Sequence, residues 1–499
     1  PMLEGERSYQ RGQENLVPGN NASSAPENPV IPKAQENPWY IRHFIKLLIG
    51  FGLGGGAVAI LLPWMLWLHC GMSSSNSDQL RLHLLYVTGG IIAVLTLLQT
   101  NWKNQGDRLK IDADIKKNEQ DAEKNERDHI RQVHAERRSR YAKAVEQLAD
   151  EKATVRLGGI YTLVGLVDEW LADESLKEES ARQKEGQVIV NSLCSYIRSP
   201  FPLALKAEMI EGDSEPDNYE GDFSKDQAVF HEEQDVRRAV FVEMSKRSST
   251  FTRDGIGTVI NTFPGMWSDF EFDFSRAPIF YPLNTITIEK GNFSGAKFYA
   301  GANFAEATFT SNANFRAATF TSYADFVMAT FTSDANFSSA IFTSNANSIA
   351  ATFTSNANFH GTRFTSDANF CWATFTSKAN FHRTSFISNA DFRGARFTYI
   401  ATFSKAIFTR HVSFFRTTFT QYGPIFTMAE SEEYKAQFSV WADPRDYDFS
   451  VSSESKPIKC GTATLLGKSF AVPLGTVLYD PESWDEEKQN YTRISEPAQ

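Results

Sequence analysis

Residues 303–342 read NFAEATFTSNANFRAATFTSYADFVMATFTSDANFSSAIF, and phenylalanine returns in this stretch every five or six residues. The same spacing extends from Phe293 to Phe419, with one interruption at Ser348. A small residue, most often alanine, lies two positions before most of these phenylalanines. The stretch is therefore a short repeat, and it accounts for most of the 40 phenylalanines of the 499-residue chain.

This spacing excludes the common regular structures. In an α-helix, a phenylalanine at every fifth or sixth position would point in all directions, and the strands of a hairpin sheet alternate with a period of two. A coil that turns a corner after each unit fits, because each face then contributes one inward phenylalanine and one inward small residue. Four such faces close a turn in about 22 residues. Two sets of phenylalanines are therefore predicted to stack in columns: Phe309, Phe331, Phe353, Phe375, Phe397 and Phe419, and Phe320, Phe342, Phe364, Phe386 and Phe408.

Here the chain resembles the pentapeptide-repeat family. The resemblance is carried by Ala-Asn/Asp-Phe units, as in residues 313–315, that alternate with Ala-Thr-Phe-Thr-Ser units, as in residues 318–322. It implies a right-handed, four-sided β-helix. The chain departs from the common family pattern by using phenylalanine where leucine is usual and by adding a residue to every other unit. We therefore expect an α + β-solenoid fold, in which N-terminal helices precede a β-helix over residues 267–426 and a C-terminal cap and tail over residues 427–499.

Two apolar segments predict a transmembrane helical hairpin over residues 41–102. The first, residues 47–68, is apolar for about 22 residues, and the second, residues 84–98, becomes long enough when residues 82–102 are counted. Two buried core helices are the alternative. The preceding residues, 1–40, lack a periodic apolar pattern and are predicted to form a disordered tail.

Basic residues predict the orientation of the hairpin. The loop between the spans, residues 71–82, holds only Arg81, whereas several basic residues flank the spans on the other side: Arg42, Lys46, Lys103, Arg108 and Lys110. Because basic loops stay in the cytoplasm, we expect both termini and the repeat domain on the cytoplasmic side of a bacterial plasma membrane.

The segment between the spans and the repeat divides into two parts. Residues 103–140 are charged nearly throughout, with pairs such as Asp112 and Lys116 at helical spacing, which predicts a solvated helical stalk. Residues 141–250 carry apolar residues at helical spacing and predict a small helical domain, with Trp170 and Tyr161 in its core. Part of this domain resembles the helices that precede the coils in bacterial pentapeptide-repeat proteins.

No motif for catalysis, cofactor binding or metal binding is found. The sequence has no P-loop, nucleophile elbow, HExxH motif or EF-hand loop, and its four cysteines lie far apart with no CxxC spacing. Aspartates of the repeat, such as Asp325 and Asp334, occupy corners where asparagine also occurs, and are interpreted as turn formers. We expect a non-enzymatic protein with no cofactor and no metal, in which Cys371 is a free thiol at an outward corner.

Two features of the coil surface are candidates for binding. Threonines flank one phenylalanine column and predict a regular outward ladder that includes Thr308, Thr330 and Thr352. Basic residues gather toward the C-terminal coils and form a candidate interaction face, with solvated charges that keep the coil soluble as the alternative. The residues of this face are Arg363, Arg383, Arg393, Arg396, Lys405, Arg410 and Arg416.

These observations favour a membrane-anchored, non-enzymatic scaffold that presents a rigid surface to a protein partner at the cytoplasmic face. One alternative is a membrane-perturbing effector, for example in anti-phage defence, in which the repeat senses a partner and the spans oligomerise. A second alternative is mimicry of DNA to inhibit gyrase, which some family members perform with an acidic rod. The repeat holds eleven Lys and Arg against five acidic residues between Lys290 and Arg416, so it lacks the required acidity and nucleic acid is not an expected partner.

Overall fold

Contacts divide the chain of this computed structural model into two compact units, residues 1–128 and 129–499. The structure describes residues 38–212, 214–254, 259–299, 301–428, 434–488 and 490–499. The predicted tail, residues 1–40, lies outside the described residues except for its last three.

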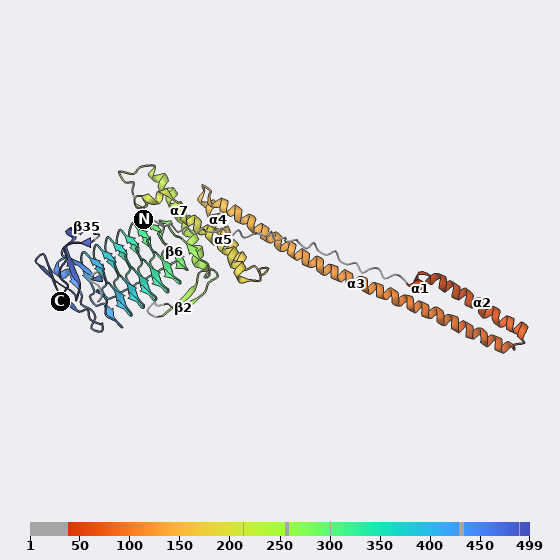
Figure 1. Ribbon diagram of the computed structural model, residues 1–499. Helices are drawn as coiled ribbons and strands as arrows, with labels where there is room; N and C mark the ends of the chain where they lie inside the picture. The colour runs from red at the N-terminus through yellow and green to blue at the C-terminus, as the bar shows by residue number, and fades with distance from the viewer. Residues whose placement is uncertain (1–37, 213, 255–258, 300, 429–433, 489) are drawn as a thin grey trace, which may run out of the picture. The chain divides into compact units, whose positions relative to one another are not determined.

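The first unit is helical. It contains α1 (Trp39–Arg42), α2 (Phe44–Cys70) and most of α3 (Ser74–Leu148), and α2 and the beginning of α3 run side by side (Figure 1). Gly71 ends α2 in the left-handed conformation, as is common after a helix. The 75 residues of α3 include both the second predicted span and the predicted stalk.

Both α2 and α3 are long and apolar enough to cross a membrane, by length and composition. They meet through small groups, since a methyl group at Gly55 would collide with Thr88 and the hydroxyl of Ser77 lies 3.5 Å from the carbonyl oxygen of Pro63. Apolar side chains elsewhere on the pair are exposed, Leu53 by 72%, as expected of helices surrounded by lipid. Within the described residues, neither helix is buried in a core, which favours the hairpin over the alternative of two buried core helices.

The second unit begins with packed helices, whose buried face includes Leu163, Leu193 and Val240. Trp170 is buried as predicted, but Tyr161 is 54% exposed, so its assignment to the core is wrong: it lies on the face of its helix opposite these residues. The helices are α4 (Ala153–Leu171), α5 (Glu179–Arg198), the short η1 (Pro202–Lys206), α6 (Ala207–Ile210) and α7 (Phe223–Arg247).

Ion pairs attach the end of α3 to α4. Asp173 accepts hydrogen bonds from His134, at 2.9 Å, and from Arg137, while Arg140 pairs with Glu169. Burial alone would raise the pKa of Asp173, but hydrogen bonds from Ser175, Arg137 and His134 outweigh it and hold the pKa well below its usual range.

Four parallel sheets of two-residue and three-residue strands follow, and they confirm the predicted β-solenoid (Figure 1). The first sheet holds β3 (Phe272–Asp273), β6 (Gly291–Asn292), β10 (Ala313–Asn314), β14 (Ala335–Asn336), β18 (Ala357–Asn358), β22 (Ala379–Asn380) and β26 (Ala401–Thr402). The second holds β4 (Pro278–Ile279), β7 (Lys297–Phe298), β11 (Thr319–Phe320), β15 (Ile341–Phe342), β19 (Arg363–Phe364), β23 (Ser385–Phe386), β27 (Ile407–Phe408), β30 (Gln437–Ser439) and β34 (Val477–Tyr479).

The other two sheets complete each turn of the coil. The third sheet holds β8 (Ala302–Asn303), β12 (Ala324–Asp325), β16 (Ala346–Asn347), β20 (Ala368–Asn369), β24 (Ala390–Asp391), β28 (Val412–Ser413) and β31 (Tyr447–Asp448). The fourth holds β5 (Thr287–Ile288), β9 (Thr308–Phe309), β13 (Thr330–Phe331), β17 (Thr352–Phe353), β21 (Thr374–Phe375), β25 (Arg396–Phe397) and β29 (Thr418–Phe419). The chain visits the four sheets in this order, so the second and fourth sheets lie on opposite sides of the coil.

The strand register gives a coil of 22 residues, in agreement with the turn of about 22 residues expected from the sequence. Phe331 pairs with Phe353 and Ala313 with Ala335, each 22 residues apart. Both predicted phenylalanine columns are present, with ring centroids 4.6 to 5.0 Å apart in the first and 4.3 to 5.3 Å in the second. Ser348 is buried at the position of a phenylalanine in a third column.

Both ends of the coil are covered. At the first coil, the Phe241 ring of α7 lies 4.5 Å from that of Phe274, so the helical domain and the coil share one apolar core. At the last coil, Tyr447 packs against Phe470. The remaining elements of the cap are the antiparallel pair β32 (Cys460–Leu465) and β33 (Lys468–Pro473), the pair β35 (Trp484–Asp485) and β36 (Asn490–Tyr491), and the turns η3 (Pro444–Asp446) and η4 (Pro481–Ser483).

Candidate interaction surface

The seven basic residues of the predicted interaction face lie at several positions around the coil. Arg363 is on the second sheet, in β19, and Arg396 is on the fourth, in β25. The others occupy turns: Arg383 and Lys405 between the first and second sheets, Arg410 between the second and third, and Arg393 and Arg416 between the third and fourth.

This placement separates the residues into groups on different sides. Arg363, Arg383 and Lys405 belong to one side, whereas Arg393, Arg396 and Arg416 belong to the opposite side. The seven residues therefore do not form one face. Their role in binding stays a prediction, for each group taken alone.

On four of five successive coils, the turn between the third and fourth sheets carries apolar side chains, and Arg393 and Gly394 occupy it on the coil between Trp372 and Phe415. We call it the apolar corner and define it by Val327, Met328, Ile349, Ala350, Cys371, Trp372 and Phe415. Met328 is 55% exposed, Trp372 62% and Phe415 42%. With successive coils about 4.8 Å apart, the corner extends about 19 Å along the coil.

The turn between the first and second sheets has the same backbone and different chemistry. In both turns the second residue adopts a left-handed conformation, with φ of 57° at Met328 and 59° at Trp372, and 58° at both Ser339 and Arg383. We call this second turn the polar corner and define it by Arg316, Ala317, Ser338, Ser339, His360, Gly361, His382 and Arg383. Serine, alanine and glycine thus satisfy the turn, so its geometry does not explain the apolar side chains of the other corner.

Trp372 is held against the neighbouring coil. A Cβ atom at Gly394 would lie 2.6 to 2.8 Å from atoms of the Trp372 ring, so only glycine leaves room for the indole at this distance. Gly394 also has a φ of +66°, which glycine adopts without strain. The indole is therefore fixed in position although most of its surface is open to solvent.

A hairpin covers the beginning of the predicted threonine ladder. Strands β1 (Thr250–Arg253) and β2 (Val259–Phe263) pair antiparallel, and the Arg253 guanidinium donates to the hydroxyls of Thr308, at 2.9 Å, and Thr330, at 3.2 Å. These two threonines are buried, whereas Thr352 on the next coil is partly exposed. The predicted threonine ladder is thus exposed to solvent only beyond Thr330.

Cys371 differs from its prediction. It was expected at an outward corner, but its side chain is only 8% exposed, and burial together with Asp391 raises the pKa of its thiol to about 11. The thiol is therefore neutral at pH 7 and poorly suited to nucleophilic attack.

Histidines gather at the polar corner. The rings of His360 and His382 stack 5.2 Å apart, and burial, His360 and the cations Arg383 and Lys405 lower the pKa of His382. Among the residues that the structure describes, no group of three or more His, Cys, Asp or Glu is arranged to hold a metal ion.

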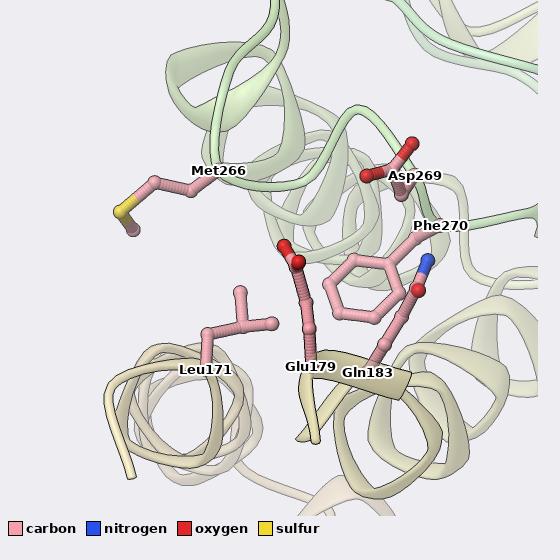
Figure 2. A pocket seen from close by; sticks show the side chains of 6 residues that line it. All are labelled: Leu171, Glu179, Gln183, Met266, Asp269 and Phe270. Carbon is pink, nitrogen blue, oxygen red and sulfur yellow. The ribbon is translucent and has the colours of Figure 1, made fainter. Parts of the chain in front are cut away.

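A small pocket lies between the end of α4, the beginning of α5 and the segment that leads into the coil (Figure 2). Its volume is about 40 Å³, and its walls are Leu171, Met266 and Phe270 with the polar groups of Glu179, Gln183 and Asp269. Figure 2 shows the Glu179 carboxylate beside the Phe270 ring. This volume holds only a few water-sized groups, so the pocket is too small for a metabolite.

The coil matches a known family. Residues 293–341 and 373–418 match the family model described as pentapeptide repeats (9 copies). No curated protein and no solved structure matches the chain.

Proposed function

We propose that this chain, which carries pentapeptide repeats, is a membrane-anchored scaffold that uses the apolar corner to bind a protein partner in the cytoplasm and has no enzymatic activity. The observation that carries the proposal is the difference in side chains between two corners whose second residues have nearly the same left-handed φ. Exposed Met328 and Trp372 do not contribute to the core, and serine or glycine would form the same turn. Large apolar side chains that folding does not require favour a binding role.

The chemistry of the apolar corner is typical of an interface centre. Trp, Phe, Met and Arg are enriched at such sites, and Trp and Arg often dominate their binding energy. Arg393 and Arg416 lie in the same turn and Arg396 borders it, and the Arg416 guanidinium lies 5.0 Å from the ring of Phe415. Because every turn is fixed by the strand register and the phenylalanine columns, the surface loses little conformational entropy on binding.

Anchoring is supported by α2 and α3, which are long and apolar enough to span a bilayer. The basic residues that flank the two spans support a cytoplasmic location for both termini and for the repeat. A scaffold held in this way would concentrate its partner at the membrane surface.

The test is crosslinking in native membranes, followed by mass spectrometry of the captured proteins. Met328→Ser combined with Trp372→Ser should abolish capture of the partner, because truncation of a central Trp costs about 2 kcal/mol or more. Arg383→Ser combined with Lys405→Ser, at the corresponding positions of the turn between the first and second sheets, is the matched control and should leave capture unchanged.

Equal capture by both variants and the unaltered chain would contradict the apolar corner as the binding surface. Loss of capture in the control variant alone would assign binding to the basic residues of the opposite side. Growth arrest and dye entry on induction, without a captured protein, would instead support the membrane-perturbing effector.

A further inference from the structure

A groove lies where the last coil meets the cap. It has a volume of about 480 Å³ and is formed by three segments, residues 423–427, 456–459 and 473–474. The apolar corner ends at Phe415 and contributes no residue to it. An inference about this groove is therefore independent of the proposed function.

The backbone around the groove is already paired. Ile425 continues the first sheet by pairing with Thr402, the Lys456 amide donates to the Phe419 carbonyl at 2.8 Å, and the Leu474 amide donates to the Lys459 carbonyl at 2.9 Å. These contacts fix the two sides of the groove relative to the end of the coil.

Prolines limit how an occupant can bind. Pro424, Pro457 and Pro473 line the groove and have no amide hydrogen, so they cannot donate to an added strand. An occupant must therefore be recognised mainly through its side chains rather than by extension of the sheet.

The side chains of the groove combine apolar surface with positive charge. Ile425 and Ile458 are half-buried and Leu474 is 44% exposed, so they offer apolar contact area. Lys456 and Lys459 are exposed, and among the residues that the structure describes, those that line the groove include no Asp or Glu.

We propose that this groove binds an acidic segment of a partner protein, in which apolar side chains contact the groove and carboxylates pair with Lys456 and Lys459. Charge complementarity selects the partner, and the apolar residues add contact area.

The test uses three synthetic peptides with one apolar pattern: the acidic GSDLVDLSG, the basic GSKLVKLSG and the neutral GSSLVSLSG. Cys460 is exposed next to Lys459 and outside the groove lining, so an environment-sensitive dye on its thiol should report occupancy. The full chain in detergent carries Cys70→Ser, since Cys70 is the other exposed cysteine and Cys194 and Cys371 are buried.

The acidic peptide should give a saturable dye response that the other two peptides do not give. Lys456→Glu combined with Lys459→Glu should weaken its binding at least about tenfold, because reversal replaces attraction by repulsion. Lys297→Glu combined with Lys378→Glu makes the same change of charge at exposed positions away from the groove and should leave the affinity unchanged.

Absence of a saturable response, equal binding of the basic peptide, or unchanged affinity in the groove variant would overturn the proposal. Sedimentation could show a mass that rises with protein concentration, with this rise absent in the groove variant. That result would assign the groove to a second copy of the chain and would also overturn the proposal. If the glutamate variant fails to fold, by circular dichroism, Lys456→Gln combined with Lys459→Gln serves in its place and should still weaken binding of the acidic peptide severalfold.

Discussion

Ser348 interrupts a phenylalanine column, and we expect Ser348→Phe to increase the energetic contribution of Phe370. The Phe370 ring stacks on Phe392 at 5.2 Å, and on its other side the column position belongs to Ser348. By contrast, Phe375 stacks on both sides, on Phe353 at 4.8 Å and on Phe397 at 4.7 Å.

The difference in stacking sets the magnitude. Truncation of a buried phenylalanine to alanine costs about 3 to 5 kcal/mol, and one stacked aromatic pair contributes about 0.5 to 1.5 kcal/mol of this. Phe375→Ala should therefore cost about 0.5 to 1.5 kcal/mol more than Phe370→Ala. In the Ser348→Phe background, where a ring supplies the missing partner, the cost of Phe370→Ala should rise by a similar amount.

The assay is a double-mutant cycle on the free energy of unfolding, measured in guanidinium by pulse proteolysis of the full chain in detergent. Phe397→Ala is the control, because position 348 is separated from it by more than one coil, and the two changes should be additive within about 0.5 kcal/mol. A coupling of zero between positions 348 and 370 would refute the stacking argument. Destabilisation by Ser348→Phe alone of more than about 1 kcal/mol would show that the column has no room for the ring.

Three further changes test other parts of the molecule. Asp173→Ala should lower the free energy of unfolding at pH 7 by about 2 kcal/mol, because it removes the buried charged acceptor of hydrogen bonds from Arg137 and Ser175, although Arg137 keeps its pair with Glu169. Since the folded pKa of Asp173 is lowered, the stability it provides is complete above about pH 4 and is lost at lower pH, so the acid branch of a pH titration of stability should be shallower in the variant. In intact protoplasts, an impermeant thiol reagent should label Cys70 but not Cys460, and labelling of Cys460 would reverse the proposed orientation. Gly394→Ala should displace the indole packed on it and change its fluorescence, whereas Gly361→Ala, with the same left-handed φ but its nearest neighbour 3.8 Å away, should not.

The architecture of the coil could be predicted because each position repeats after a fixed number of residues. The interval of 22 residues between equivalent phenylalanines already determines which residues pair in the sheets. Ser348 is recognisable as an exception because the other positions of its column are occupied by phenylalanine. The hairpin of β1 and β2 could not be predicted in the same way. Its contact between Arg253 and Thr308 joins residues 55 positions apart, and no periodicity connects them.

The placement of the seven basic residues around the coil could not be predicted for a different reason. These residues were grouped by closeness in the sequence, but closeness in a coil depends on the position within the 22-residue turn. Arg383 and Lys405 differ by 22 and share a position, whereas Arg393 and Arg396 are three residues apart and lie on a turn and a strand. Burial of Cys371 is a local effect of its neighbours, in which Asp391 and Arg393 surround the thiol.

The coil separates the requirements of folding from those of binding. Inward phenylalanines and alanines fix the backbone, so each outward position can change without altering the turn on which it stands. The apolar and polar corners show this independence, because one left-handed turn carries Trp, Met, Ser, Arg or Gly with nearly the same φ. Met328 and Trp372 are exposed to water and make no contacts in the core. Residues such as Ser339 show that smaller polar side chains are compatible with the turn. The chemistry of the apolar corner is therefore better explained by contact with another molecule than by the stability of the coil.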